Sequence, residues 1–129
     1  MEVQLVSPEQ ILYTGEARMV VLRTLGGGDI AFEDNHALFL GALDNWPVRV
    51  KFEDGTQQWF AVHGGFVEVG NNRVIILSDV AELSSDIDTE RARLAKERAQ
   101  ERLRQDAEDE EALSALARAE VRLEVALSS

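Results

Sequence analysis

The sequence predicts an α+β protein in which an antiparallel β-sandwich of about ten strands is followed by an antiparallel two-helix hairpin. Two observations predict this class. Up to Leu83, short apolar runs alternate with polar residues and are separated by Gly and Asn turns, a period of two that is typical of strands. From Ser84 onwards, Ala, Leu, Glu and Arg recur every three or four residues without any Gly or Pro, which is typical of helices. We therefore expect a sandwich domain at residues 1–83 and a helical domain at residues 84–129.

The short apolar runs of the first domain lie close together, and this spacing favours an antiparallel sandwich or barrel over a parallel sheet. In the run 48–52, apolar residues alternate with Arg49 and Lys51, so we expect one face in the core and the other in water. The candidate strands are, in order, 3–6, 11–13, 17–22, 30–32, 38–43, 48–52, 58–62, 66–69 and 73–77.

Gly and Asn residues mark the turns between these runs. Asp54 and Gly55 predict a tight hairpin in which both central residues take positive φ, and the segment 70–72, Gly-Asn-Asn, predicts a second such turn. Three consecutive glycines at 26–28 are interpreted as a hairpin tip. A phosphate-binding loop would need a following Gly-Lys-Ser/Thr and a helix, and neither is present.

Composition excludes several classes of function. The net charge of −11 disfavours nucleic acid and anionic membrane surfaces as partners, because both repel an acidic chain. There is no cysteine for a disulfide or a thiolate site. His36 and His63 lack further ligands at metal spacing, so we expect them at a turn or core edge and predict neither a metal site nor a catalytic residue. No apolar run approaches the roughly 20 residues that cross a bilayer, so we expect a soluble, intracellular protein without direct membrane insertion.

The second domain is expected to begin with a capped helix. Four residues at the junction offer side-chain oxygens to a first helical turn: Ser84, Ser85, Asp86 and Asp88. The first helix is predicted from Asp88 to about residue 104 and the second from about residue 110 to residue 127. An acidic cluster at 106–111 starts the second helix and Arg102 and Arg104 end the first, and both placements match the helix dipole.

Alanines predict that these two helices pack closely against each other. Small side chains let two helices approach, and the second helix also carries an apolar leucine seam beside its alanine strip. The alanine strips are Ala92, Ala95 and Ala99 on the first helix and Ala112, Ala115, Ala119 and Ala126 on the second; the leucine seam is Leu113, Leu116, Leu123 and Leu127.

Arg118 and Arg122 have no acidic residue three or four positions away on their own helix, and at i, i+4 they repel each other weakly. Folding the hairpin brings them toward Arg91 and Arg98 of the first helix. Four guanidinium groups along one seam can bind a polyphosphate, because each planar fork binds two oxygens. The alternative is ordinary ion pairing across the hairpin, and the residues alone leave both open. For such ion pairing, the candidate partners of the arginines are Glu97, Glu101 and Glu120.

Two motifs resemble the epsilon subunit of bacterial F-type ATP synthases, and the resemblance covers the whole chain. Residues 64–69, Gly-Gly-Phe-Val-Glu-Val, are similar to that family's Gly-Gly-Phe-x-Glu-Val strand. Residues 87–92, Ile-Asp-Thr-Glu-Arg-Ala, resemble the Ile/Leu-Asp-x-x-Arg-Ala motif of those members that bind ATP in the helical hairpin. A ten-stranded sandwich followed by a helical hairpin is also that family's architecture.

The resemblance implies a nucleotide site made of eight residues. Arg91, Arg98, Arg118 and Arg122 would hold the phosphates, and Glu82, Ile87, Asp88 and Ala92 would surround the adenosine part. ATP would be a regulatory ligand, and no cofactor is required. The chain departs from the family at residues 28–38, where Gly28 and His36 remain but a second glycine and two prolines of the family's rotor-facing segment are lost.

The resemblance further implies a non-catalytic subunit of the central rotor of a proton-translocating ATP synthase. Its partners would be the gamma subunit, the c-ring and the alpha/beta catalytic head, and it would lie peripherally at the cytoplasmic face of the bacterial plasma membrane. It would couple the head to the membrane ring and inhibit ATP hydrolysis through its C-terminal helices, and ATP bound to the folded hairpin would be the regulatory signal. The alternative is a rotor subunit whose hairpin is purely structural and binds no nucleotide. A small enzyme is disfavoured, because no nucleophile, metal set or paired acid and base is evident.

Overall fold

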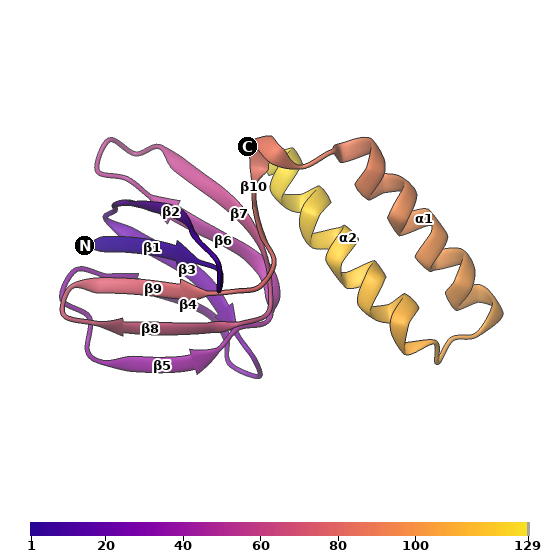
Figure 1. The fold of residues 1–129 in the computed structure, drawn as a ribbon, viewed down its shortest axis with the longest axis horizontal. Helices are drawn as coiled ribbons and strands as arrows, with labels where there is room; N and C mark the ends of the chain where they lie inside the picture. The colour runs from indigo at the N-terminus through magenta and orange to yellow at the C-terminus, as the bar shows by residue number, and fades with distance from the viewer. Residues whose placement is uncertain (129) are drawn as a thin grey trace.

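The computed structural model describes residues 1–128 and confirms the predicted class, a β-sandwich followed by two helices. In Figure 1 the hairpin lies beside the sandwich, and α2 runs between the sandwich and α1. Within residues 1–128 the strands are β1 (Glu2–Val6), β2 (Ile11–Glu16), β3 (Met19–Thr24), β4 (Gly28–Glu33), β5 (Phe39–Ala42), β6 (Asn45–Lys51), β7 (Gln57–His63), β8 (Phe66–Gly70), β9 (Arg73–Leu77) and β10 (Ala81–Leu83). The helices are the short 3₁₀ helix η1 (Ser84–Asp86), α1 (Thr89–Gln105) and α2 (Glu110–Ser128).

Two five-stranded sheets form the sandwich. The sheet with strand order β2-β1-β9-β8-β5 is called the outer sheet here, and the sheet with order β10-β7-β6-β3-β4 is called the helix-facing sheet. Among the described strand pairs, only β1 and β9 run parallel, which corrects the expectation of a wholly antiparallel sandwich. Parallel neighbours cannot be joined by a tight turn. Here most of the sandwich domain lies between the two strands in the sequence, so no such turn is needed.

The core lies between the two sheets and follows the predicted period of two. On β3, for example, Val20 and Leu22 are completely buried while their neighbours are partly exposed. Burying one such side chain contributes about 1.5–3 kcal/mol, so this set is the main source of stability in the sandwich. The buried members of the core are Met1, Val3, Leu5, Ala17, Val20, Leu22, Phe32, Leu43, Val48, Val50, Phe60, Val62, Val67, Val69, Val74 and Ile76.

The two predicted tight turns differ in conformation. Asn71 and Asn72 have φ of 53° and 57°, so the turn between β8 and β9 has the expected positive φ at both central residues. Between β6 and β7 only Gly55 has positive φ, at 87°, and the prediction for Asp54 was wrong. The Asp54 carboxylate instead accepts hydrogen bonds from the amide and the hydroxyl of Thr56, at 2.9 and 2.6 Å. That side-chain contact stabilises a longer loop, as Asp commonly does in turns.

Gly65 explains why a Gly-Gly pair stands between β7 and β8. Its φ is 117°, a conformation that other residues rarely adopt, and an added Cβ would lie 2.0 Å from the carbonyl oxygen of Leu77. The chain crosses here from the helix-facing sheet to the outer sheet. A larger residue would push apart the two segments that meet at this crossing.

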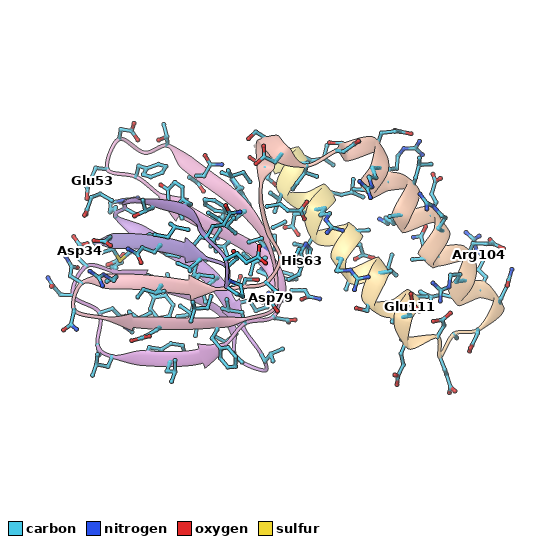
Figure 2. The ribbon with its side chains drawn as sticks, viewed as in Figure 1. Asp34, Glu53, His63, Asp79, Arg104 and Glu111 are labelled. Atoms are coloured by element: carbon cyan, nitrogen blue, oxygen red, sulfur yellow. The ribbon has the colours of Figure 1, made fainter. Side chains whose placement is uncertain are left out.

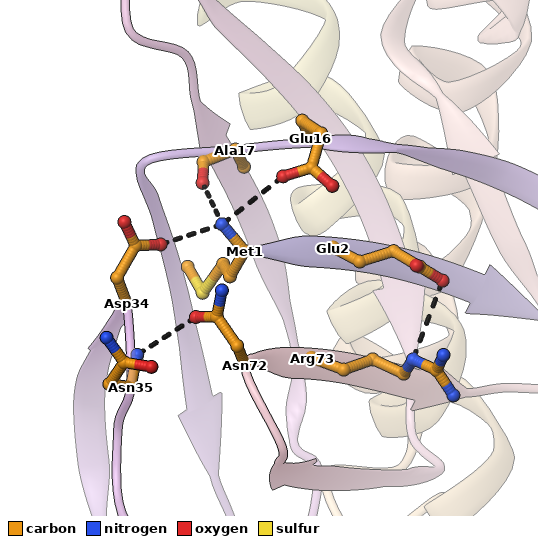
Figure 3. A network of polar contacts seen from close by, with 8 residues as sticks. All are labelled: Met1, Glu2, Glu16, Ala17, Asp34, Asn35, Asn72 and Arg73. Carbon is orange, nitrogen blue, oxygen red and sulfur yellow. Dashed lines mark hydrogen bonds and ion pairs between the residues drawn. The ribbon is translucent and has the colours of Figure 1, made fainter.

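Polar contacts join both sheets at the end of the sandwich away from the hairpin (Figures 1 and 3). The amino group of Met1 donates to the Asp34 carboxylate at 2.7 Å and to the Ala17 carbonyl oxygen at 3.0 Å. The Asp34 hydrogen bond raises the pKa of this amino group above its ordinary value. Nearby, the backbone amide of Asn35 donates to the side chain of Asn72 at 3.0 Å, which ties the end of β4 to the turn before β9.

The two helices form the predicted antiparallel hairpin, with each start capped by an aspartate. The carboxylate of Asp88 accepts from the amide of Arg91, and that of Asp109 accepts from the amide of Ala112, each at 3.0 Å. Ala92, Ala99, Ala112 and Ala119 are buried. Within residues 1–128, neither helix is long and apolar enough to cross a membrane.

The expected leucine seam on α2 was wrong at its two ends, whereas Leu116 and Leu123 are partly buried. Leu113 is 48% exposed and Leu127 is 75% exposed, whereas Val121 and Val125 are buried. The two valines face the sandwich, where they pack with Ala61 of β7. The side of α2 that is covered is therefore the one that meets the helix-facing sheet and the alanines of α1.

Candidate functional site

A cavity of about 410 Å³ lies where β10, η1, α1 and α2 meet. It includes seven of the eight residues that the family resemblance assigns to a nucleotide, together with Asp86 and Ala95. The seven are Glu82, Ile87, Asp88, Arg91, Ala92, Arg98 and Arg122. The fold therefore gathers residues that lie up to 40 positions apart in the chain.

The residues that line the cavity are positioned by a strand, by a helix cap and by the spacing of residues along a helix. Glu82 is held in β10, opposite Ala61 of β7. Asp88 is the cap of α1, and its carboxylate is held by the hydrogen bond that it accepts from the Arg91 backbone amide. On α1, Arg91 and Arg98 are seven residues apart, which is two helical turns, so their side chains leave the same face.

Arg122 is paired with Glu82 across the junction between the hairpin and the sandwich. Its Nε donates to Glu82 Oε1 at 2.6 Å, and both side chains are partly buried, with exposures of 28% and 29%. The missing acidic partner of Arg122 is thus on β10 rather than on either helix. Two of the three glutamates expected as cross-hairpin partners bind arginines of their own helix instead, since Glu97 contacts Arg93 and Glu101 contacts Arg104.

Arg118 is the one predicted site residue that does not line the cavity. Its terminal nitrogen donates to the hydroxyl of Ser114 at 2.6 Å on the exposed surface of α2. It lies one helical turn before Arg122. Its predicted role at a phosphate therefore finds no support in the shape of this cavity and stays a prediction.

His63 is a residue of this junction that the sequence reasoning treated only as a core-edge residue. Its side chain is 4% exposed, and its Nε2 lies 3.4 Å from Glu82 Oε1. Neither ring nitrogen has a hydrogen-bond partner among the described residues. Burial lowers the pKa of His63 below its ordinary value, and Arg122 lowers it further. Glu82 opposes this by raising the pKa, and Arg118 makes a smaller lowering contribution. The period of two on β7 places His63 on the same face of the strand as Trp59. That pattern was the one sequence signal that could have placed His63 at the docking surface.

The remaining contact between hairpin and sandwich is small and apolar. Val121 and Val125 of α2 pack on Ala61, with Trp59 and Ile87 at the edge of the cluster. The Arg49 guanidinium lies 5.3 Å from the centre of the Trp59 ring, on the face of the sheet that α2 covers. Among residues 1–128, the hairpin thus docks through this small apolar cluster and one ion pair.

Comparisons with known proteins agree with this architecture over both domains. Residues 1–84 match the family model of the ATP synthase delta/epsilon chain β-sandwich domain, and residues 85–126 match that of the delta/epsilon chain long α-helix domain. The chain belongs to the ATP synthase delta/epsilon chain family.

Curated relatives place it among the epsilon chains of that family. It is 46% identical over 103 residues to the ATP synthase epsilon chain of Brevibacillus brevis, covering 80% of this chain and 77% of the relative. It is 39% identical over 126 residues to that of Streptomyces coelicolor, covering 98% and 94%. The sequence-based assignment to bacterial epsilon subunits is confirmed, and epsilon chains are non-catalytic subunits of ATP synthase.

Solved structures share the epsilon-chain fold. A chain in the cryo-EM structure of Euglena gracilis mitochondrial ATP synthase, with F1 and the c-ring, superposes with a TM-score of 0.71 at 23% identity, over 98% of this chain and 78% of that one. A chain of the Tetrahymena thermophila mitochondrial ATP synthase central stalk and c-ring gives a TM-score of 0.54 at 16% identity, over 67% and 68%. At these identities the likeness concerns the fold.

Proposed function

We propose that this epsilon chain works in the central rotor of a bacterial F-type ATP synthase and that ATP, bound in the cavity at the junction, holds its hairpin against the sandwich. The rotor role is supported by the matching chains, which come from structures that contain a c-ring and, in one case, a central stalk. Its partners would be the gamma subunit, the c-ring and the alpha/beta head. The chain would then lie peripherally at the cytoplasmic face of the plasma membrane.

Exposed apolar side chains on the outer sheet support a protein contact there. Phe66 and Leu77 are 57% and 44% exposed and lie directly opposite each other on β8 and β9. Leu40 of β5, opposite Glu68 of β8, is 74% exposed. Large exposed apolar groups that adjoin on one surface typically mark an interaction site. We assign this face to the rotor contacts, on the side of the sandwich away from the helix-facing sheet.

The observation that carries the nucleotide proposal is the pair of arginines on one wall of the cavity. Among residues 1–128, neither Arg91 nor Arg98 forms an ion pair, although both line a cavity with Asp86, Asp88 and Glu82 at its edge. Arg122 uses its Nε for Glu82, which leaves its two terminal nitrogens for a ligand. A volume of about 410 Å³ also falls within the range of about 300–1,000 Å³ that small-molecule sites occupy.

ATP in this cavity would act as a latch because its walls come from both domains. Glu82 belongs to the sandwich, whereas Arg98 and Arg122 belong to the two helices of the hairpin. A ligand that contacts all three binds only the docked form and shifts the equilibrium toward it, by about 2.7 kcal/mol at 100 times its dissociation constant. High ATP would hold the hairpin down, and low ATP would free it to inhibit ATP hydrolysis by the alpha/beta head.

The second candidate is a hairpin that docks without nucleotide and serves only as a structural or interaction element. The Glu82–Arg122 ion pair favours it, because this contact is complete without a ligand. In that case, removing arginines from α1 would change the contacts of the hairpin, and there would be no nucleotide affinity to lose.

Calorimetric titration of the purified chain with ATP, and with ADP for comparison, separates the two candidates. Arg91→Ala/Arg98→Ala is expected to lower ATP affinity by at least tenfold, since each charge-assisted contact contributes about 1.5–3 kcal/mol. Arg104→Ala is the matched control, because Arg104 pairs with Glu101 at the far end of the hairpin (Figure 2). No heat from the unmodified chain at millimolar ATP, or equal affinities for both variants, would reject the nucleotide site.

The inhibitory role needs the assembled ATP synthase. A chain that ends at residue 87 lacks both helices and is expected to give a complex with faster ATP hydrolysis, most clearly at low ATP. Unchanged hydrolysis at every ATP concentration would contradict the inhibitory role and leave the rotor role standing.

A further inference from the structure

His63 stands out because it is buried and polar yet has no hydrogen-bond partner among the described residues. Figure 2 shows it at the edge of the sandwich that faces α2. It ends β7, and it points outward on the same face of the strand as Trp59 and Ala61, the residues on which α2 packs. Buried polar groups are paired in the great majority of cases, so an unpaired imidazole at a docking surface calls for an explanation.

Charged groups of both signs surround this imidazole. Glu82 on β10 lies 3.4 Å from its Nε2. Arg122 and, more weakly, Arg118 act on it from α2. Asp79, in the segment between β9 and β10, lines a second cavity together with His63. On the remaining side, β6 places Asn45 opposite His63, a residue that does not ionise.

We propose that His63 couples hairpin docking to proton binding: the docked hairpin requires the neutral imidazole, and protonation of His63 favours release of the hairpin. The inference rests on the proposed function in one respect only, namely that the hairpin exchanges between a docked and a released form.

The difference between the two forms lies in what surrounds the ring. In the docked form, burial and two guanidinium groups disfavour a third positive charge, and these lower the pKa of His63. When α2 leaves, Arg122 and Arg118 leave with it and water reaches the ring. Glu82 stays, because β10 is paired with β7, and an adjacent carboxylate favours the imidazolium. The released form therefore binds the proton more tightly.

The sign of the pH effect follows from this linkage. At a pH well above the pKa of the released form, which Glu82 holds above the ordinary histidine value of about 6.5, both forms are neutral at His63 and docking does not depend on pH. Below that pKa, the released form takes up a proton that the docked form resists, so the docking constant falls by up to tenfold for each pH unit. The fall ends once the pH is below the lowered pKa of the docked form.

The same geometry suggests how protonation of His63 would weaken the ion pair between Glu82 and Arg122. Glu82 Oε1 accepts the hydrogen bond from Arg122 Nε at 2.6 Å and is the same oxygen that faces His63. An imidazolium and the guanidinium therefore compete for one carboxylate. Acid would weaken the only described ion pair between hairpin and sandwich, so acid and low ATP would act in the same direction.

The test measures docking of the full chain without nucleotide. Because the chain has no cysteine, Glu53→Cys and Arg104→Cys place one dye on the sandwich and one near the hairpin turn (Figure 2). Energy transfer in single molecules gives the docked and released populations from pH 8 to pH 5.5. The substitution Val121→Ala is added to weaken docking, so that both populations are large enough to count. We expect the docking constant to fall several-fold below about pH 6.5.

Two histidine variants decide whether His63 is the group responsible. His63→Gln keeps a neutral polar side chain and should abolish the pH dependence, whereas His36→Gln, in the loop after β4, should leave it unchanged. A docking constant that is flat in the unmodified chain, or an equal slope in His63→Gln, would overturn the proposal.

A second measurement holds even where His63→Gln disturbs docking. The imidazole of His63 is titrated by nuclear magnetic resonance in the unmodified chain and in Val121→Asp, which expels α2 from the apolar cluster. We expect a higher pKa for His63 in the released chain, and equal values would refute the coupling. Adding ATP to the labelled chain at pH 8 tests the nucleotide latch separately, because His63 is neutral there.

Discussion

The sandwich core and the junction with the hairpin are built on very different scales. The core between the two sheets contains 16 buried residues, from Met1 to Ile76, whereas the junction contains three, namely Ala61, Val121 and Val125. The strands are also joined by ladders of backbone hydrogen bonds, whereas the described contacts that hold the hairpin to the sandwich are this apolar cluster and the ion pair between Arg122 and Glu82. The two regions are therefore expected to respond separately to mutation, and we expect that the hairpin leaves the sandwich without unfolding it.

The seam between α1 and α2 differs from both regions, because alanines make it. Ala99 and Ala119 are almost completely buried, yet each methyl group covers little area. Since hydrophobic stabilisation is roughly proportional to the apolar area removed from water, such a seam holds two helices weakly. We therefore expect the hairpin and its docking to be the less stable part of the molecule, as the proposed release of the hairpin requires.

The largest effect is expected from the sandwich core. Phe60 is 1% exposed and meets the ring of Tyr13 edge to face, so Phe60→Ala should lower the free energy of unfolding by about 3–5 kcal/mol. Leu127→Ala, at a position that is 75% exposed, should change it by less than about 0.5 kcal/mol. Urea denaturation followed by circular dichroism measures both. A loss below about 1 kcal/mol for Phe60→Ala would break the proposed contrast between the regions.

The next effect separates docking from folding. Val121→Asp places a charge among Ala61, Val125 and Trp59, so the hairpin should be released while the sandwich keeps its stability within about 0.5 kcal/mol. Hydrogen exchange should show loss of protection in α2 and unchanged protection in β6 and β3. Leu113→Asp, at a position that is 48% exposed, is the control and should stay docked. Simultaneous loss of protection in both domains would mean that they fold as one unit.

A smaller effect is expected from the ion pair. Glu82→Gln keeps the shape of the side chain but removes the charge that Arg122 contacts, so docking should weaken by about 1–2 kcal/mol, at the lower end because both side chains are partly exposed. Energy transfer between dyes on the two domains measures the change. Addition of Arg122→Ala should then cost little more, because the two residues share one interaction. Fully additive losses would show that they act independently.

The smallest effect is expected at Arg118. It lies outside the cavity and donates to Ser114 on the surface of α2, so Arg118→Ala should alter docking by less than about 0.5 kcal/mol. The ATP affinity of Arg118→Ala, measured by calorimetric titration, tests whether Arg118 contacts the nucleotide. A loss as large as that of Arg98→Ala would mean that Arg118 turns toward the ligand, as the family resemblance implies, when ATP binds.

Much of the fold could be predicted from local patterns. The period of two on β3 and β6 and the absence of Gly and Pro after residue 83 depend on near neighbours, and the structure agrees with both. Relations between distant segments were harder. The parallel pairing of β1 with β9 could not be predicted in this way, because burial alternates along each of the two strands and this alternation does not depend on strand direction.

The candidate site shows the same limit. The sequence shows that Arg122 lacks an acidic partner on its own helix. Its partner in the structure is Glu82, which lies 40 residues away in the chain, on a strand of three residues. The leucines of α2 misled because periodicity shows that a helix has an apolar face but not which neighbours will cover it. In the structure, two neighbours share α2, and the valines rather than the most exposed leucines meet the sandwich.

The parallel pair of β1 and β9 has a consequence for how the chain is made. The first strand lies between β2 and β9, so one of its two edges has no partner until the ribosome has added more than 60 further residues. At about 5–20 residues per second, that edge stays open for several seconds. Nascent sandwiches are therefore expected to recruit chaperones until β9 emerges. The wait of α1 is shorter, because the helix that packs beside it follows it directly in the chain.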